Sequence, residues 1–258
     1  MIIEFIIIII IIIIVIISII SILIYYKYKY KYKHQDNNIP KKIYITSKTK
    51  SIPEYVINNW KQLNPTYEII HYDNEECIKY LKNNFTQEHV DIFNYIKDGP
   101  IKADFFRVCV IYMEGGVYSD IDIKLLVPID EFVEKDVNFL TCISYMTDGI
   151  NPHFIIAPPK HKILKKCIDK YLEFYRTKKT YGYWDWSIVH IMADIIYKHF
   201  GYHINNSGLY YDNNNNKIQL LKEVWNDTSS NKNLYCEYKD KIILYNRHDD
   251  YDSDNHTY

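Results

Sequence analysis

The stretch from residue 99 to residue 124 places the tightest constraint on the fold of this chain. Apolar residues recur at helical spacing through its first half, which predicts an amphipathic helix. Gly115-Gly116 follows directly, and a glycine pair after a helix is typical of a left-handed cap and a sharp turn. Residues 117–123 then alternate in a way that predicts a strand, on which Asp120 and Asp122 lie on the same side.

Two carboxylates on one side of a strand repel each other unless a positive charge lies between them. A hard divalent cation bound by oxygen atoms would remove that repulsion. Asp104 and Arg107 lie three residues apart and share one face of the preceding helix. Taken alone, a D-x-D tripeptide is usually a solvated strand edge, and an Asp/Arg pair is usually a surface ion pair. Their combination in one stretch favours a ligand that carries a diphosphate and a bridging metal.

This combination resembles the core of the DXD-containing sugar transferases of glycosyltransferase family 32. That group includes the yeast-type initiating mannosyltransferases, the capsular polysaccharide transferases and, more distantly, the sugar-binding region of the clostridial glucosylating toxins. Its pattern is S/A-D-x-x-R, an apolar helix, and then G-G-x-Y-x-D-x-D. The chain matches this pattern in register at Ala103-Asp104, Arg107, Gly115-Gly116, Tyr118, Asp120 and Asp122.

The resemblance implies a glycosyltransferase with a GT-A-like, Rossmann-type sandwich fold. It implies a UDP- or GDP-hexose donor, Mn²⁺ or Mg²⁺ as cofactor, and transfer to a glycan, protein or lipid acceptor with retention at the anomeric carbon. In such a site Asp122 is the first choice of metal ligand, and Asp120 would bind the metal, the ribose or a sugar hydroxyl. His248 corresponds to a late histidine that completes the metal shell in the family.

The remaining matched residues are expected at the donor. Asp104 and Arg107 would hold the diphosphate-sugar, because arginine suits bidentate contact with phosphate. Tyr118 would pack on the donor. No catalytic nucleophile can be assigned from this sequence.

Strand and helix patterns alternate from residue 39 onward, which predicts an α/β domain over residues 39–258 with a mostly parallel central sheet. Ligands of such sheets bind beyond the carboxyl ends of the strands, where Asp120 and Asp122 are expected. Trp184 and Trp186 suit either a sugar-stacking surface or the core, and core packing is the preferred interpretation. The expected strands are 39–46, 67–72, 137–144 and 151–157, the expected helices are 53–63, 73–83, 87–96, 160–175 and 184–199, and a hairpin is expected at 235–245.

The N-terminal segment is almost wholly apolar over residues 2–24, a length of about 34 Å at about 1.5 Å per helical residue. Residues 1–24 are therefore expected to form an uncleaved, single-pass membrane anchor, and residues 25–38 a polar Lys/Tyr tether. A signal peptide is disfavoured, because the segment lacks a basic start and a small-residue cleavage site. The lysines at 27–33 favour a cytoplasmic domain, whereas many anchored transferases face a lumen.

Composition and motif spacing argue against several other functional classes. The net charge of −1 gives no electrostatic case for a nucleic-acid partner. The five cysteines are scattered, odd in number and without C-x-x-C, which argues against a disulfide framework and against a structural zinc site. A haloacid-dehalogenase-type phosphatase needs threonine two residues after the second aspartate, where this chain has Lys124. No glycine-rich phosphate loop is present.

One alternative of a different functional class remains. It is a membrane-anchored binding or scaffold protein built on an inactive transferase fold. Tyr44 and Ser47 stand where the family pattern has histidine and tryptophan. The chain also lacks the T-G-P triplet found in many relatives and the closing S-W after His248.

Overall fold

A computed structural model describes residues 14–23, 39–48, 50–146, 149–226 and 234–247. The chain divides into two compact units, residues 1–38 and residues 39–258. In the first unit residues 14–23 are helical. Within the described ranges, no helix combines the length and the apolar character needed to cross a bilayer. Most of the expected anchor at 1–24, and all of the expected tether at 25–38, lie outside the described residues.

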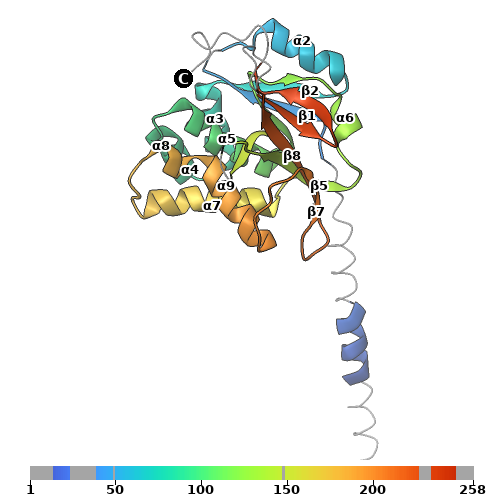
Figure 1. The fold of residues 1–258 in the computed structure, drawn as a ribbon. Coiled ribbons are helices and arrows are strands. Elements are labelled where there is room, and N and C mark those ends of the chain that lie inside the picture. Colours follow the sequence, from blue (N-terminus) through green and yellow to red (C-terminus); the bar gives the residue numbers. More distant parts are fainter. Residues whose placement is uncertain (1–13, 24–38, 49, 147–148, 227–233, 248–258) are drawn as a thin grey trace, which may run out of the picture. The chain divides into compact units, whose positions relative to one another are not determined.

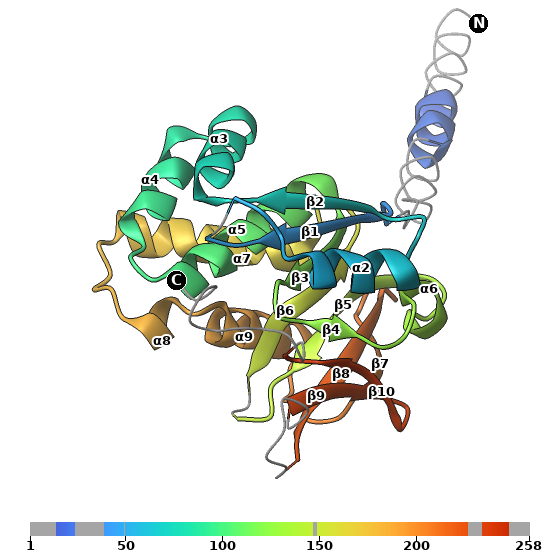
Figure 2. The same cartoon turned by 90° about the horizontal axis from the view of Figure 1, so that it is seen from above.

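The second unit is an α/β domain, as expected, built on one ten-stranded sheet of order β2-β1-β3-β6-β5-β8-β9-β10-β4, with β7 paired to β8 (Figures 1 and 2). Its strands are β1 (Lys42–Thr46), β2 (Glu68–Tyr72), β3 (Gly116–Asp120), β4 (Lys124–Leu125), β5 (Val137–Ile143), β6 (Ile150–Ala157), β7 (Gly208–Tyr211), β8 (Lys217–Trp225), β9 (Leu234–Tyr238) and β10 (Lys241–Tyr245). Its helices are α2 (Glu54–Leu63), α3 (Asn74–Asn84), α4 (Gln87–Tyr95), α5 (Gly99–Glu114), α6 (Ile129–Phe132), α7 (Lys162–Arg176), α8 (Tyr183–Trp186) and α9 (Ile188–Phe200).

The expectation of a mostly parallel sheet is wrong, because the sheet is mixed. Only β1–β2, β1–β3 and β5–β8 pair in parallel among the described strands. The first two pairs follow the helical crossovers through α2 and through α3 to α5, which parallel neighbours require. From β5 onward short turns join β5 to β6 and β9 to β10, so these neighbours run antiparallel.

The sheet separates two cores because its side chains alternate between the faces. Tyr44 and Tyr118 point to a core shared with α3, α4, α5, α7 and α9. Ile43 and Val117, their sequence neighbours, point to a second core shared with α2 and α6. Figures 1 and 2 show the larger group of helices on one side of the sheet and α2 and α6 on the other. Helix α5 therefore lies between the sheet and other helices, and it is buried along most of its length.

The glycine pair after α5 turns the chain into β3, as predicted. Gly115 and Gly116 have φ values of 67° and 98°, which residues with a side chain rarely adopt. A Cβ atom on Gly115 would lie 2.5 Å from Cδ of Pro159, and one on Gly116 would lie 2.7 Å from the carbonyl oxygen of Lys42. The backbone thus passes close to the β6–α7 connection and to β1, and this contact directs β3 into the sheet.

We expect Gly115→Ala to lower the free energy of unfolding by about 1–3 kcal/mol, since the substitution adds both backbone strain and a clash. Gly201→Ala is the matched control. Gly201 also has a positive φ, of 81°, but nothing lies within 4 Å of the position of its Cβ. Urea denaturation should show a smaller loss for the control. Equal losses in the two variants would mean that Pro159 does not restrict this turn.

Candidate functional site

Asp120 and Asp122 lie at the carboxyl ends of β1 and β3. Asp120 is the last residue of β3 and is opposite Thr46, the last residue of β1, in a parallel pair. The strand ends there instead of continuing to Ile123 as predicted, because the chain turns and the amide of Ile123 donates to the carbonyl oxygen of Asp120 at 3.4 Å. Asp122, two residues after Asp120, therefore lies in the turn that follows the strand and not on the same strand face.

Arg107 holds Asp120 from the neighbouring helix. Its guanidinium lies 3.1 Å from a carboxylate oxygen of Asp120 and 3.1 Å from one of Asp104, and only 5% of its side chain is exposed. It also donates to the carbonyl oxygen of Pro152 at 2.9 Å. Its carbon Cζ lies 4.7 Å from the ring centroid of Tyr118, which is a cation–π contact. One buried cation thus joins α5, the end of β3 and the start of β6.

Two further contacts fix the carboxylates around this arginine. The hydroxyl of Tyr118 donates to Asp120 at 3.0 Å and lies 2.8 Å from the hydroxyl oxygen of Thr46. The second oxygen of Asp104 accepts a hydrogen bond from the amide of Ile188 at 3.1 Å, so this carboxylate stabilises the first turn of α9.

Sequence reasoning predicted donor contacts for Asp104, Arg107 and Tyr118, and those contacts stay predictions. The structure brings all three together with Asp120, in a buried arrangement in which their polar groups bind one another. The roles of Thr46 and Ile188 were not foreseen. A hydroxyl at a strand end and a backbone amide have no distinctive pattern in a sequence.

Burial makes the negative charges at this place unfavourable. The pKa of Asp122 is raised to about 7, first by burial and then by the charge of Asp120. Burial also raises the pKa of Asp120, against the opposing effect of Arg107, and raises that of Asp104 to about 6. Each carboxylate of the pair makes ionisation of the other less favourable, so a bound cation would be stabilising here. Both side chains offer oxygen atoms as ligands, which suit a hard divalent cation.

The C-terminal end of the described chain also approaches the pair. Arg247, the last described residue, is among the charges that lower the pKa of Asp122. His248, the predicted third metal ligand, follows it directly and lies outside the described residues.

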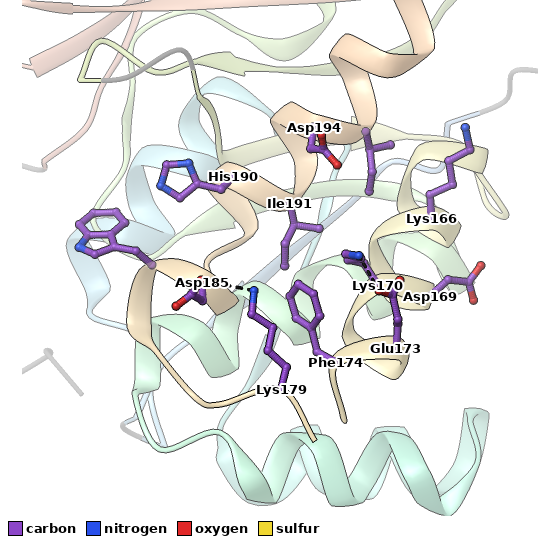
Figure 3. A pocket seen from close by; sticks show the side chains of 12 residues that line it. Lys166, Asp169, Lys170, Glu173, Phe174, Lys179, Asp185, His190, Ile191 and Asp194 are labelled. Carbon is purple, nitrogen blue, oxygen red and sulfur yellow. Dashed lines mark hydrogen bonds and ion pairs between the residues drawn. The ribbon is translucent and has the colours of Figure 1, made fainter. Parts of the chain in front are cut away.

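A pocket of about 590 Å³ lies elsewhere, between α7, α8 and α9 (Figure 3). Lysines and carboxylates line it together, and the ion pair of Lys179 and Asp185, 3.3 Å apart, lies beside Phe174. Trp184 also lines it and is 60% exposed, so its assignment to the core is wrong. Trp186 is fully buried, which confirms the core assignment for that residue.

The residues predicted to bind the donor do not line this pocket. Tyr183 stacks edge-on against Trp184, with ring centroids 5.1 Å apart. Burial raises the pKa of Tyr183, and the negative charge of Asp104 raises it further. Tyr183 therefore contacts a residue that lines the pocket and also feels the charge of Asp104.

Comparison with known proteins identifies the segment that carries this site. Residues 53–138 match the family described as a glycosyltransferase sugar-binding region containing a DXD motif. The initiation-specific alpha-1,6-mannosyltransferase of Candida albicans is 30% identical over 105 residues, which cover 37% of this chain and 27% of that protein. Inositol phosphoceramide mannosyltransferase 1 of Schizosaccharomyces pombe is 25% identical over 142 residues, which cover 53% of this chain and 44% of that protein.

A solved structure, the PaToxG glycosyltransferase, shares the fold. It superposes with a TM-score of 0.51 at 16% sequence identity, over 63% of this chain and 70% of that chain. The chain spans less than half the length of either curated relative above. Within that extent, these matches confirm the predicted resemblance to the DXD-containing sugar transferases.

Proposed function

We propose that this chain, whose residues 53–138 carry a DXD-containing sugar-binding region, is a metal-dependent glycosyltransferase. It moves a hexose from a nucleotide-sugar donor to a glycan, protein or lipid acceptor, with retention at the anomeric carbon. Both curated relatives described above are named as mannosyltransferases, so a mannosyl donor is the first to test. The apolar residues at 1–24 support attachment to a membrane, and the lysines at 27–33 support a cytoplasmic domain.

One observation carries the proposal. Asp120 and Asp122 lie at the carboxyl end of β3, and Arg107 forms an ion pair with Asp120. Asp120 and Asp122 would hold Mn²⁺ or Mg²⁺. A bound divalent cation supplies charge neutralisation for the diphosphate leaving group. Arg107 and Tyr118 orient the Asp120 carboxylate before any ligand arrives, because both bind it directly.

The second candidate function is an inactive scaffold on the same fold. The departure from the family pattern at position 44 favours it. Tyr44 is 1% exposed and belongs to the core, so its side chain offers nothing to a donor.

A donor assay separates the two candidates. The full-length chain, purified in detergent, is incubated with UDP- and GDP-sugars, with Mn²⁺ or with chelator, and the released nucleotide is measured. We expect metal-dependent release of nucleotide from one donor. The released nucleotide, GDP or UDP, then identifies the class of hexose donor. Absence of release, together with no calorimetric binding of any nucleotide-sugar or of Mn²⁺, would contradict the proposal and leave the scaffold.

A further inference from the structure

A second cluster of metal-binding side chains lies inside the domain, away from the carboxylate pair. Cys142 of β5, His153 of β6 and Cys236 of β9 each offer one ligand atom, and these atoms all lie within 4.8 Å of one another. Cys142 and Cys236 have no exposed surface, and His153 is 4% exposed. The cluster therefore forms part of the protein interior.

The register of the sheet explains why three residues so far apart in sequence meet. Cys142 pairs with Leu221 on β8, and Cys236 pairs with Glu223, two residues further along the same strand. Residues two apart on a strand share a face, so both thiols point to the same side of the sheet. Cys142 also pairs with Asn151 on β6, beside an irregularity in the register, and His153 lies two residues beyond Asn151, where its ring comes within 4.8 Å of both thiols.

The donor atoms and their surroundings match those of a thiolate–imidazole metal site. Sγ of Cys236 lies 3.5 Å from Nε2 of His153, a separation that two ligands of one tetrahedral ion can have. Nδ1, on the other side of the ring, lies 3.5 Å from a carboxylate oxygen of Glu223. A ligating histidine usually has such a carboxylate at its second nitrogen. Glu223 is 2% exposed and accepts a hydrogen bond from Asn151 at 2.8 Å.

We propose that Cys142, Cys236 and Nε2 of His153 bind one zinc ion, as three of the four ligands of a tetrahedral structural site. Two thiolates and one neutral imidazole around Zn²⁺ carry no net charge, so this group can be buried without an uncompensated ion. Sulfur and imidazole donors select zinc over the hard cations expected at Asp120 and Asp122. Zinc binding releases the two thiol protons to solvent, and no other reactant is needed.

The position of the cluster gives the ion a structural consequence. It would tie β5, β6 and β9 together, although β8 lies between β5 and β9 in the sheet. His153 directly follows Pro152, whose carbonyl oxygen accepts the hydrogen bond from Arg107. The zinc site would therefore fix the strand that supports the arginine of the candidate active site. Linear spacing could not indicate it, because Cys142 and Cys236 lie on different strands far apart in the chain.

The test is the metal content of the full-length chain, purified without chelator and measured by inductively coupled plasma mass spectrometry. We expect about one zinc per chain, lost in Cys236→Ala and retained in Cys167→Ala. Cys167 is also fully buried but lies on α7, outside the cluster, so it controls for removal of a core thiol. Asp122→Ala should also keep its zinc, which separates this site from the carboxylate pair.

A second measurement does not depend on the variants folding. Wild-type protein grown with cobalt in place of zinc should show thiolate-to-cobalt charge-transfer absorption. The alternative is a metal-free cluster of hydrogen-bonded thiols and imidazole. Wild-type protein with no zinc above background and no thiolate–cobalt band would establish that alternative and overturn the proposal, as would a Cys236→Ala variant that keeps its full zinc content.

Discussion

Replacing Asp122 with alanine is expected to abolish sugar transfer and leave the domain folded. Asp122 lies in the turn after β3, and burial together with Asp120 raises its pKa to about 7. Its ionised form is therefore unfavourable in the folded protein, and its removal takes away a destabilising charge. Under the proposed function, the substitution would also remove a ligand of the cation that neutralises the diphosphate leaving group. Nucleotide release with the active donor, followed beside thermal unfolding, measures both effects.

The matched control is Asp169→Ala. Asp169 lies on α7 with 51% of its side chain exposed, where it pairs with Lys165. This variant should keep wild-type activity and a wild-type unfolding temperature. Undiminished activity of Asp122→Ala would remove Asp122 from the site. Loss of folding in Asp122→Ala would contradict the inference that the charge of Asp122 destabilises the folded protein.

Local patterns predicted the parts of the domain that depend on neighbouring residues. The helix before Gly115-Gly116, the positive φ of both glycines and the strand that follows are all present. The helix expected to begin at Asp73 is also present as α3, and Asp73 caps it by accepting a hydrogen bond from the amide of Glu76 within a full capping box. Each of these features is determined by residues within a few positions of one another.

Features that depend on distant partners were not predictable in this way. Periodicity shows that a segment is a strand but not which strand pairs with it, so the antiparallel β3–β6 and β5–β6 pairs were missed. The hairpin expected at 235–245 is local in sequence, and it is present as the β9–β10 pair. The apolar pattern of α5 suggested one buried stripe with Asp104 and Arg107 on a polar face. Packing of α7 and α9 against the other side buries that face too, and both charged residues become internal. Trp184 and Trp186 flank Asp185 and look alike in the sequence, yet one is exposed and the other is buried. The turn of α8 alone directs their side chains to different surroundings.

Arg107→Met is expected to produce the largest loss of stability, about 3–5 kcal/mol, because it leaves the buried carboxylate of Asp104 and the partly buried carboxylate of Asp120 without their cation. Asp104 and Asp120 each lie 3.1 Å from the guanidinium, and the carbonyl oxygen of Pro152 would lose its donor as well. Urea denaturation followed by tryptophan fluorescence measures the loss. In the fraction that remains folded, transfer should also fall, since Asp120 loses the group that orients it.

Two further variants show whether burial of the charge is the cause. Arg176 makes two hydrogen bonds of 2.7 Å to Glu88, but 62% of its side chain is exposed, so Arg176→Met should change stability far less. Adding Asp104→Asn to Arg107→Met should recover part of the loss, because it removes one uncompensated charge and keeps an oxygen acceptor for the amide of Ile188. Equal losses for the two arginines, or no recovery in the double variant, would show that Arg107 contributes packing and not charge compensation.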